Sequence, residues 1–262
     1  MRALNYEVEE NKRSFADVAR EFLLEEGLLD PSSPTTTAPG RDQGLLALLW
    51  SRRIETLRLV GEHLALTGAA VSLAIIVAVP LGLVLTRRER WAGPVIGATA
   101  VIQTIPSLAL LAFMIPVPGL GLGTTSAVVA LFLYALLPIV RNTYAGVRGV
   151  DPELVEAARG MGLTDAQVLR LVELPLAVRT IMAGVRTSTV ISIGVATLAA
   201  FIGAGGLGDP IITGLQLDDT GLILSGALPA ALLAVLTDAL LGGLERLLVP
   251  RGLAPRRSAG PP

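Results

Sequence analysis

Residues 64–85 read LALTGAAVSLAIIVAVPLGLVL, a run of 22 residues without a charged side chain. A helix rises 1.5 Å per residue, so a run of this length can cross a hydrocarbon core of about 30 Å. Four later stretches have a similar length and are almost free of charge: residues 93–115, 122–140, 181–203 and 222–244. Only Arg186 and Asp238 interrupt them. The chain is therefore predicted to be an all-α membrane protein with about five transmembrane helices.

The composition of the whole chain agrees with this prediction. Of its 262 residues 52% are hydrophobic and 16% are charged, whereas a soluble domain usually carries about 25% charged residues. The net charge of −1 argues against a nucleic-acid partner held by overall basicity. Without cysteine, and with His63 as the single histidine, the chain has neither a thiolate nor a multi-histidine metal site, and no cofactor is expected. We expect His63 itself to be an interfacial residue just before the first span.

The segment before the spans differs in character. Residues 1–30 contain eight acidic and four basic side chains and lack the pattern of a cleavable signal peptide. Within this segment one short amphipathic helix is predicted, with Ser14 and Asp17 as a capping box and Gly27 at its C-terminal end. Its apolar positions follow helical spacing: Phe15, Val18, Ala19, Phe22 and Leu23. The stretch 31–44, rich in Pro, Ser and Thr, is interpreted as a linker.

The remaining boundaries follow from polarity. Residues 45–253 form the predicted transmembrane domain, and residues 254–262 are interpreted as a disordered tail. Within the domain, residues 44–63 mix leucines with arginines, which favours an interfacial lead-in helix anchored by Trp50.

The arginines of the connecting loops predict the orientation, because loops rich in Lys and Arg stay cytoplasmic. They follow the first span (Arg87, Arg88, Arg90), the third span (Arg141, Arg148, Arg159, Arg170, Arg179) and the fifth span (Arg246, Arg251, Arg256, Arg257). The alternate loops, PVPGLG and GAGGLGDPIITGLQLDDTG, contain neither Lys nor Arg. The C-terminus is therefore predicted to be cytoplasmic and the N-terminus outside, although Arg52, Arg53 and Arg58 oppose the second assignment.

The long loop between the third and fourth spans, residues 151–180, reads DPELVEAARGMGLTDAQVLRLVELPLAVRT. Asp151 can cap a helix that begins at Pro152 and is broken by Gly160 and Gly162. A second helix is predicted to start at Thr164 and to end at Leu174-Pro175. Two short helices with a glycine turn would make a rigid knob, whose alanines allow close docking on another protein. The alternative is an ordinary re-entry helix that binds nothing.

The spacing in this loop resembles the signature E-A-A-x3-G-x9-I-x-L-P of ATP-binding cassette (ABC) importer permeases, with Val172 in place of the usual Ile. The corresponding residues, which the resemblance identifies as the ATPase-coupling element, are Glu156, Ala157, Ala158, Gly162, Leu174 and Pro175. Residues 44–253 as a whole look like the permease subunits of osmoprotectant importers, as in HLALTGAAVSLAIIVAVPLGLVLTRR and RTSTVISIGVATLAAFIGAGGLGDPI. This resemblance implies the family of importers for glycine betaine, choline or carnitine.

The resemblance carries expectations of its own. It implies the MetI-like fold in a bacterial cytoplasmic membrane, surrounded by lipid, with the coupling loop docked on a cytoplasmic ATPase. Further partners would be an external substrate-binding protein and a second permease copy or paralogue. Residues 1–30 resemble the closing stretch of such binding proteins, so they are interpreted as a remnant of one or as the end of a larger fused domain. Neither the osmolyte nor the choice between homodimer and heterodimer follows from the residues.

Two polar features lie within the spans. Pro106 frees the carbonyl of Ile102 for water or a neighbouring hydroxyl, and the polar stretch around it is a candidate lining of the substrate pathway: Gln103, Thr104, Pro106 and Ser107. The alternative is that these side chains bond between helices. Arg186 and Asp238 share a depth near the cytoplasmic edge, so we expect an ion pair, with snorkelling of Arg186 as the alternative.

Other functions were weighed against transport by an ABC system. A stand-alone secondary transporter or channel would place more ionisable residues at mid-membrane and show inverted repeats. The glycine run at residues 203–208 fits G-x-G-x-x-G, but a dinucleotide site needs a preceding strand. The chain has no G-x-x-x-x-G-K-[ST] motif and no paired acid, base or nucleophile, so it is predicted not to be an enzyme.

Overall fold

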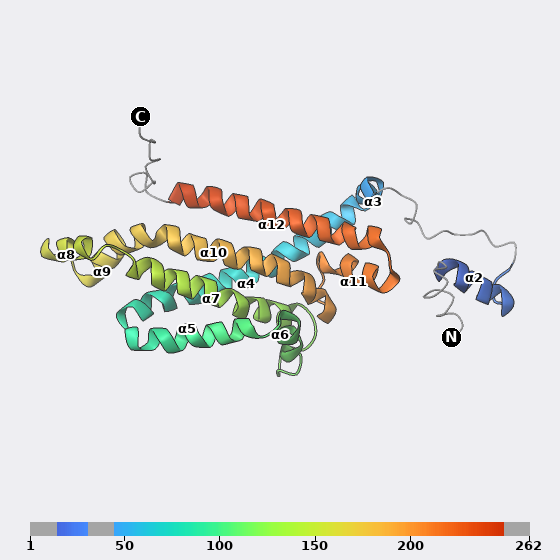
Figure 1. Ribbon diagram of the computed structural model, residues 1–262, viewed down its shortest axis with the longest axis horizontal. Coiled ribbons are helices and arrows are strands. Elements are labelled where there is room, and N and C mark those ends of the chain that lie inside the picture. Colours follow the sequence, from blue (N-terminus) through green and yellow to red (C-terminus); the bar gives the residue numbers. More distant parts are fainter. Residues whose placement is uncertain (1–14, 31–44, 249–262) are drawn as a thin grey trace, which may run out of the picture. The chain divides into compact units, whose positions relative to one another are not determined.

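The structure is a computed structural model that describes residues 15–30 and 45–248 (Figure 1). Every regular element in these two stretches is a helix. The chain divides into two units, residues 1–51 and 52–262, which are described separately.

The first unit contains α2 (Phe15–Glu25) and α3 (Leu45–Ser51). Helix α2 lies where the apolar spacing predicted it. It ends at Glu25, and Gly27 follows as the expected C-terminal cap, with a left-handed φ of 69° and with the N–H of Leu28 donating to Leu23 O at 2.9 Å. Ser14, the first residue of the predicted capping box, lies outside the described residues.

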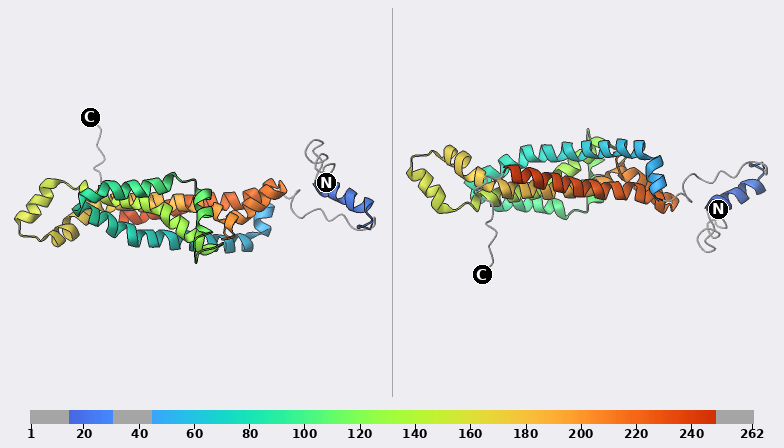
Figure 2. Two further views of the ribbon diagram at one scale, coloured as in Figure 1. Left: turned by 90° about the horizontal axis from the view of Figure 1, so that it is seen from below. Right: turned by 90° about the horizontal axis from the view of Figure 1, so that it is seen from above.

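The second unit is a helical bundle. Its elements are α4 (Arg53–Arg87), α5 (Glu89–Thr104), α6 (Ser107–Met114), α7 (Thr124–Arg148), α8 (Pro152–Gly160), α9 (Asp165–Val168), the π turn η1 (Leu169–Glu173), α10 (Leu174–Ala196), the 3-10 turn η2 (Thr197–Ile202), α11 (Gly208–Leu217) and α12 (Thr220–Leu248). Both views of Figure 2 show the long helices side by side, with α8 and α9 at one end of the unit and α11 at the other.

Four helical stretches of this unit are long and apolar enough to cross a membrane: α4, α7, the run from Asp165 to Ile202, and α12. The pair α5 and α6 makes a fifth span if it is counted as one, although it bends by 97° at its break. Each of the five predicted spans therefore corresponds to one of these stretches, and the bend falls at Pro106.

One sequence prediction about a connecting segment was wrong in its extent. Residues 44–63 do not form one lead-in helix, because Leu45–Ser51 form α3, whereas α4 begins at Arg53 and continues without a break to Arg87. Ion pairs of Arg52 with Glu55 (3.7 Å) and Arg58 with Glu62 (3.4 Å) support this polar beginning of the helix. The outer loop after the fourth span contains α11.

Helix α7 lies at the centre of the bundle, where it packs against α4, α5 and α10. Half of the apolar stretch of α7 is buried, compared with 17% of the apolar stretch of α12. Helix α12 is therefore a peripheral helix. Leu131, Ile139 and Val140 on α7 are fully buried. Glycines let the neighbouring helices approach: a Cβ on Gly184 of α10 would lie 2.6 Å from Asn142 Cβ.

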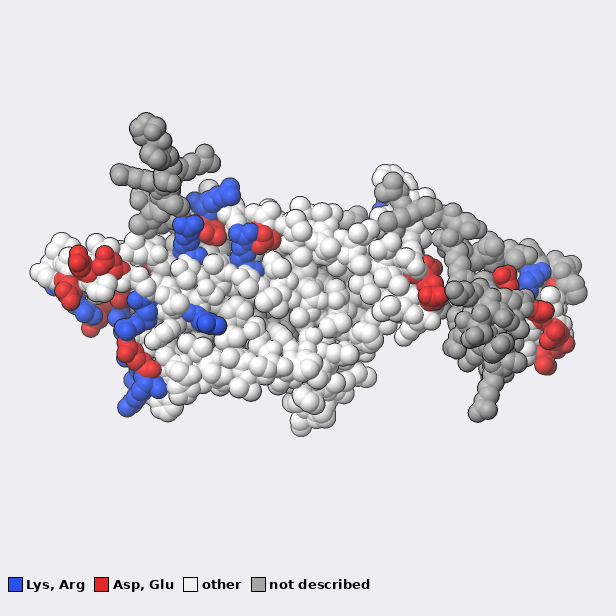
Figure 3. All heavy atoms as spheres, viewed as in Figure 1, with Lys and Arg blue, Asp and Glu red and all other residues white. Residues whose placement is uncertain are grey.

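Charged side chains are unevenly distributed. Figure 3 shows them gathered toward the end of the second unit that carries α8 and α9, and it shows a broad belt of this face without charge. An uncharged belt is what a helix bundle presents to lipid.

Candidate functional site

The loop between the third and fourth spans begins with α8, whose start follows the sequence prediction. Asp151 Oδ1 accepts a hydrogen bond from the N–H of Glu153 at 2.9 Å, and Pro152 is the first helical residue. The helix ends before Gly162, which has a φ of 86° and donates its N–H to Arg159 O at 2.9 Å. A residue with a Cβ is strained in this conformation, so the turn depends on glycine.

The second helix of the loop, α9, is held by a capping box. The N–H of Thr164 donates to Gln167 Oε1 at 2.8 Å, and the N–H of Gln167 donates back to Thr164 Oγ1 at 3.4 Å. Arg159 Nη2 and Asp165 Oδ1, 3.2 Å apart, join the two helices. Ala158 is 2% exposed and Val168 is fully buried. The loop is therefore a compact knob with its own packing.

The predicted end of the second helix at Leu174-Pro175 was wrong. Leu174 instead begins α10, and the chain passes from α9 into the span through the π turn η1, in which Leu174 N–H donates to Leu169 O five residues earlier. Pro175 lies in the first turn of α10, where a missing N–H is tolerated. The loop and the fourth span thus form one continuous helical path.

The residues of the signature occupy two different environments. Glu156, Ala157 and Gly162 are exposed on the knob. In contrast, Ala158 is buried inside the knob, and Leu174 packs on the cluster formed by Val147, Ala177 and Ile181.

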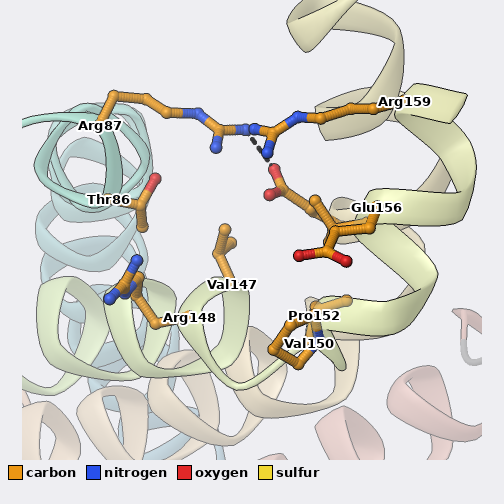
Figure 4. A pocket seen from close by; sticks show the side chains of 10 residues that line it. Thr86, Arg87, Val147, Arg148, Val150, Pro152, Glu156 and Arg159 are labelled. Carbon is orange, nitrogen blue, oxygen red and sulfur yellow. Dashed lines mark hydrogen bonds and ion pairs between the residues drawn. The ribbon is translucent and has the colours of Figure 1, made fainter. Parts of the chain in front are cut away.

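Beside the knob lies a pocket of about 250 Å³ (Figure 4). It is lined by Thr86, Arg87, Val147, Arg148, Val150, Pro152, Val155, Glu156, Arg159 and Glu173. The carboxylate of Glu156 points into the pocket, and the side chains of Arg87 and Arg159 extend into it from opposite sides. Glu173, which is 5% exposed, accepts a hydrogen bond from Arg87 Nη2. Sequence analysis missed Glu173, because nothing in its local pattern shows that Arg87, 86 positions away, lies beside it.

The polar stretch at the bend between α5 and α6 bonds mainly to protein. Gln103 Nε2 donates to Tyr134 O on α7 at 3.1 Å, and the Tyr134 hydroxyl donates to Ile105 O. Thr104 is exposed and donates to Val101 O at 2.7 Å. The carbonyl of Ile102 accepts the N–H of Ile105 at 3.2 Å, so the expected water or neighbouring hydroxyl is not required there.

Around this bend Pro106 is exposed, and Ser107 is half-buried at the start of α6. Of the four candidate pathway residues, Gln103 thus bonds across helices, as in the alternative interpretation, while Thr104 and Pro106 are open to the surroundings of the chain.

Arg186 and Asp238 lie together at the contact of α10 with α12. Arg186 donates from Nε and Nη2 to the two carboxylate oxygens of Asp238. Gly242 makes room for the guanidinium, since a Cβ there would lie 3.2 Å from Arg186 Nη1. A second pair joins Arg179 and Glu245 at 3.6 Å, seven residues before Arg186 on α10 and seven residues after Asp238 on α12. Two ion pairs therefore join the peripheral α12 to α10.

His63, which the sequence predicted to lie at the membrane interface, is fully buried within the protein. Its Nδ1 accepts the N–H of Leu207 at 3.4 Å, so Nε2 carries the proton and donates to Ile193 O at 3.0 Å. The neighbouring Glu62 Oε2 accepts the N–H of Gly206 at 3.3 Å. The glycine run at residues 203–208 is therefore a turn held against α4, and it follows a helical element.

A carboxylate close to this turn is electrostatically perturbed. Burial, and then the negative charge of Glu62, raise the pKa of Asp209, while Arg58 lowers it to a smaller extent. Glu62 also borders a pocket of about 490 Å³ between α4, α7 and the turn.

Known proteins are similar to this chain in sequence and in fold. The chain is 51% identical over 209 residues to the glycine betaine/carnitine/choline transport system permease protein OpuCB of Bacillus subtilis, covering 80% of this chain and 95% of that protein. It is 54% identical over 192 residues to the choline transport system permease protein OpuBB of the same organism, covering 73% of this chain and 88% of that protein. Against the osmoprotectant import permease protein OsmW of Salmonella typhimurium the identity is 47%, covering 73% of this chain and 91% of that protein.

A solved structure of the MetNI methionine ABC transporter in an inward-facing conformation matches the fold with a TM-score of 0.67 at 24% identity, covering 74% of this chain and 96% of that chain. The MetI-like helical fold implied by the resemblance is thereby confirmed. Residues 70–252 match the family model described as binding-protein-dependent transport system inner membrane component. The chain therefore belongs to the family of inner membrane components of binding-protein-dependent transport systems.

Proposed function

We propose that this chain is the permease subunit of an ATP-driven importer for a small osmoprotectant, a quaternary ammonium compound such as glycine betaine, choline or carnitine. The observation that carries the proposal is the 51% identity to the OpuCB permease along 95% of its length. Membership of the family implies an ATPase partner and a substrate-binding protein. The relatives are named as permeases, so the chain is a transport subunit and not an enzyme.

The runner-up function, a stand-alone secondary transporter or channel, is not favoured, because the family is binding-protein-dependent. Co-purification separates the two directly. A stable complex with an ABC ATPase encoded beside this chain supports the importer. Transport by the purified chain without any ATPase would contradict it.

The knob formed by α8 and α9 is the proposed docking element for the ATPase. Glu156, Ala157 and Gly162 are exposed, and beside them Met161 is 75% exposed and Leu154 is 49% exposed. Such a small, partly apolar surface fits a groove on a soluble partner. Ala158, Leu174 and Pro175 act in this proposal by holding the knob and its junction with the span.

The knob then lies in the cytoplasm, and the turn around His63 lies on the outer side. The arginines after the first, third and fifth spans support this orientation. Arg52 and Arg58, which oppose an external N-terminus, are paired with Glu55 and Glu62, so the local excess of positive charge is small. The location in the inner membrane follows from the family.

Gln103, Thr104, Pro106 and Ser107 remain the proposed lining of the substrate pathway at the bend of α5 and α6. The exposed side chains there, Thr104 and Pro106, would face a second permease copy or paralogue across the passage. Arg186 and Asp238 are proposed to fix α12 to α10 during transport. The part of α12 that this contact leaves exposed is proposed to face lipid.

Residues 1–30 are proposed to be a remnant of a binding protein, or the end of a larger one, joined through residues 31–44 to the permease domain at 45–253. Deleting residues 1–40 should leave membrane insertion and ATPase coupling intact if the segment is a remnant. Loss of insertion in this deletion would contradict the proposal, as would unrelated genomic sequence upstream combined with a functional requirement for residues 1–30.

A further inference from the structure

The pocket of Figure 4 lies where the coupling loop meets the spans. Its walls come from the end of α4, the end of α7, the helix α8 and the π turn η1. A displacement of α8 toward the bundle would narrow this pocket of about 250 Å³.

The pocket brings three arginines together with two glutamates. Arg87 binds Glu173, Arg148 pairs with Glu89 at 2.6 Å, and Arg159 pairs with Asp165 at 3.2 Å. Glu156 has no ion pair within residues 45–248, although it lines the same pocket as these arginines. A narrower pocket would bring this carboxylate nearer to an arginine.

The pair of Arg87 with Glu173 differs from the other two pairs because its carboxylate is almost completely buried. The Glu173 side chain is 7% exposed, and a carboxylate in such surroundings must keep its partner. Arg87 is the last residue of α4, and Glu173 is the last residue of η1, directly before α10. A shift of η1 therefore moves the end of α4 as well as the start of α10.

A π turn lies within this connection. Single π turns inside helices are rare and are frequent at functional sites, and this one spans Leu169–Glu173 between the knob and the fourth span. The guanidinium of Arg87 has five donors, so it can bind a second carboxylate without releasing Glu173.

We propose that Arg87 and Glu173 form a joint that transmits displacement of the coupling loop to α4 and α10, and that Glu156 joins Arg87 when the pocket narrows. Arg87, Glu173 and Glu156 are positioning residues in this account, since they act through the helices. The inference rests on the function proposed above, in which an ATPase moves the loop.

The first test measures osmoprotectant imported per ATP hydrolysed, in proteoliposomes that contain the chain, its ATPase and its binding protein. Arg87→Gln, Glu173→Gln and Glu156→Gln should each lower this ratio by about tenfold, within the 5- to 150-fold range of typical coupling effects. Arg88→Gln and Glu55→Gln are matched controls, since neither side chain lines the pocket or belongs to the knob, and both should keep the wild-type ratio. Charge reversal in Arg87→Glu/Glu173→Arg should restore the ratio above that of either reversed single variant.

A merely structural pair would change abundance and melting temperature but not this ratio. A wild-type ratio in Arg87→Gln or Glu173→Gln would overturn the joint, as would a reversed double variant no better than its singles. Absence of ATP-dependent uptake by the wild type would instead refute the proposed function.

The second test leaves all three charged residues in place and does not depend on uptake. Because the chain contains no cysteine, Thr86→Cys/Val155→Cys can be cross-linked across the pocket without background. Cross-linking in the complex should be faster with a non-hydrolysable ATP analogue than without nucleotide. Equal rates in the two conditions would contradict the narrowing of the pocket.

Discussion

The contact of α7 with α10 sets a measurable limit on side-chain size at Gly184. A Cβ added there would lie 2.6 Å from Asn142 Cβ and 2.7 Å from the backbone oxygen of Pro138. Ordinary Cβ contacts begin near 3.4 Å, so the two helices would have to separate by 3.4 − 2.6 = 0.8 Å. A backbone oxygen cannot rotate away as a flexible side chain can. We therefore expect Gly184→Ala to carry an overpacking penalty of about 1–3 kcal/mol.

Gly194 provides the control for this prediction, because it lies on the same helix and a Cβ there meets nothing within 4 Å. Both substitutions gain the same helix propensity, about 1 kcal/mol from Gly to Ala, so their difference isolates the packing penalty. Thermal unfolding of the purified chain in detergent measures it, at about 2–4 °C for each kcal/mol. Equal melting temperatures for Gly184→Ala and Gly194→Ala would refute the close contact.

Three further predictions concern the loop, the ion pair and the outer turn. Gly162→Leu should destabilise the knob by about 1–3 kcal/mol, because residue 162 has a positive φ. Gly162→Leu and Glu156→Lys, each as a single variant, should abolish uptake at unchanged membrane abundance; normal uptake in both variants would refute the role of the loop. In a double-mutant cycle, Arg186→Ala and Asp238→Ala should each destabilise more than the double variant does, because each leaves one charge without its partner; additive losses would exclude the coupling. Burial and Glu62 raise the pKa of Asp209, so the folded protein is more stable when this carboxyl is protonated at acid pH, and it loses that stability as the pH rises through the raised pKa. The increase in melting temperature caused by Asp209→Asn should therefore grow from about pH 4 to pH 7. An increase that does not depend on pH would contradict the assignment.

Hydropathy and local capping signals predicted most of the fold. The uncharged run at residues 64–85 needs no partner to be identified as a span, and Asp151-Pro152 and Gly162 carry the start and end of α8 in their own conformational preferences. Local signals were misleading where the chain continues through them. Leu174-Pro175 is a stop signal in isolation, but the π turn before it allows the helix to proceed.

The residues whose contacts sequence analysis did not predict depend on distant partners. His63 bonds to Ile193 and Leu207, 130 and 144 positions away, and no local pattern reports such contacts. Glu173 has the same property with Arg87. Arg186 and Asp238 could be paired from sequence because both interrupt apolar spans, and the position of each residue within its span gives its depth in the membrane. The two depths are similar, which brings the two charges to the same level.

Uptake of labelled glycine betaine, choline and carnitine into proteoliposomes tests the central claim most directly. The vesicles would contain this chain with or without its ATPase and binding protein, with ATP supplied on the side of the knob. The account predicts accumulation of at least one of the three compounds only when all components and ATP are present. Uptake that needs neither ATP nor the ATPase, or no uptake of any of the three by the complete system, would contradict it.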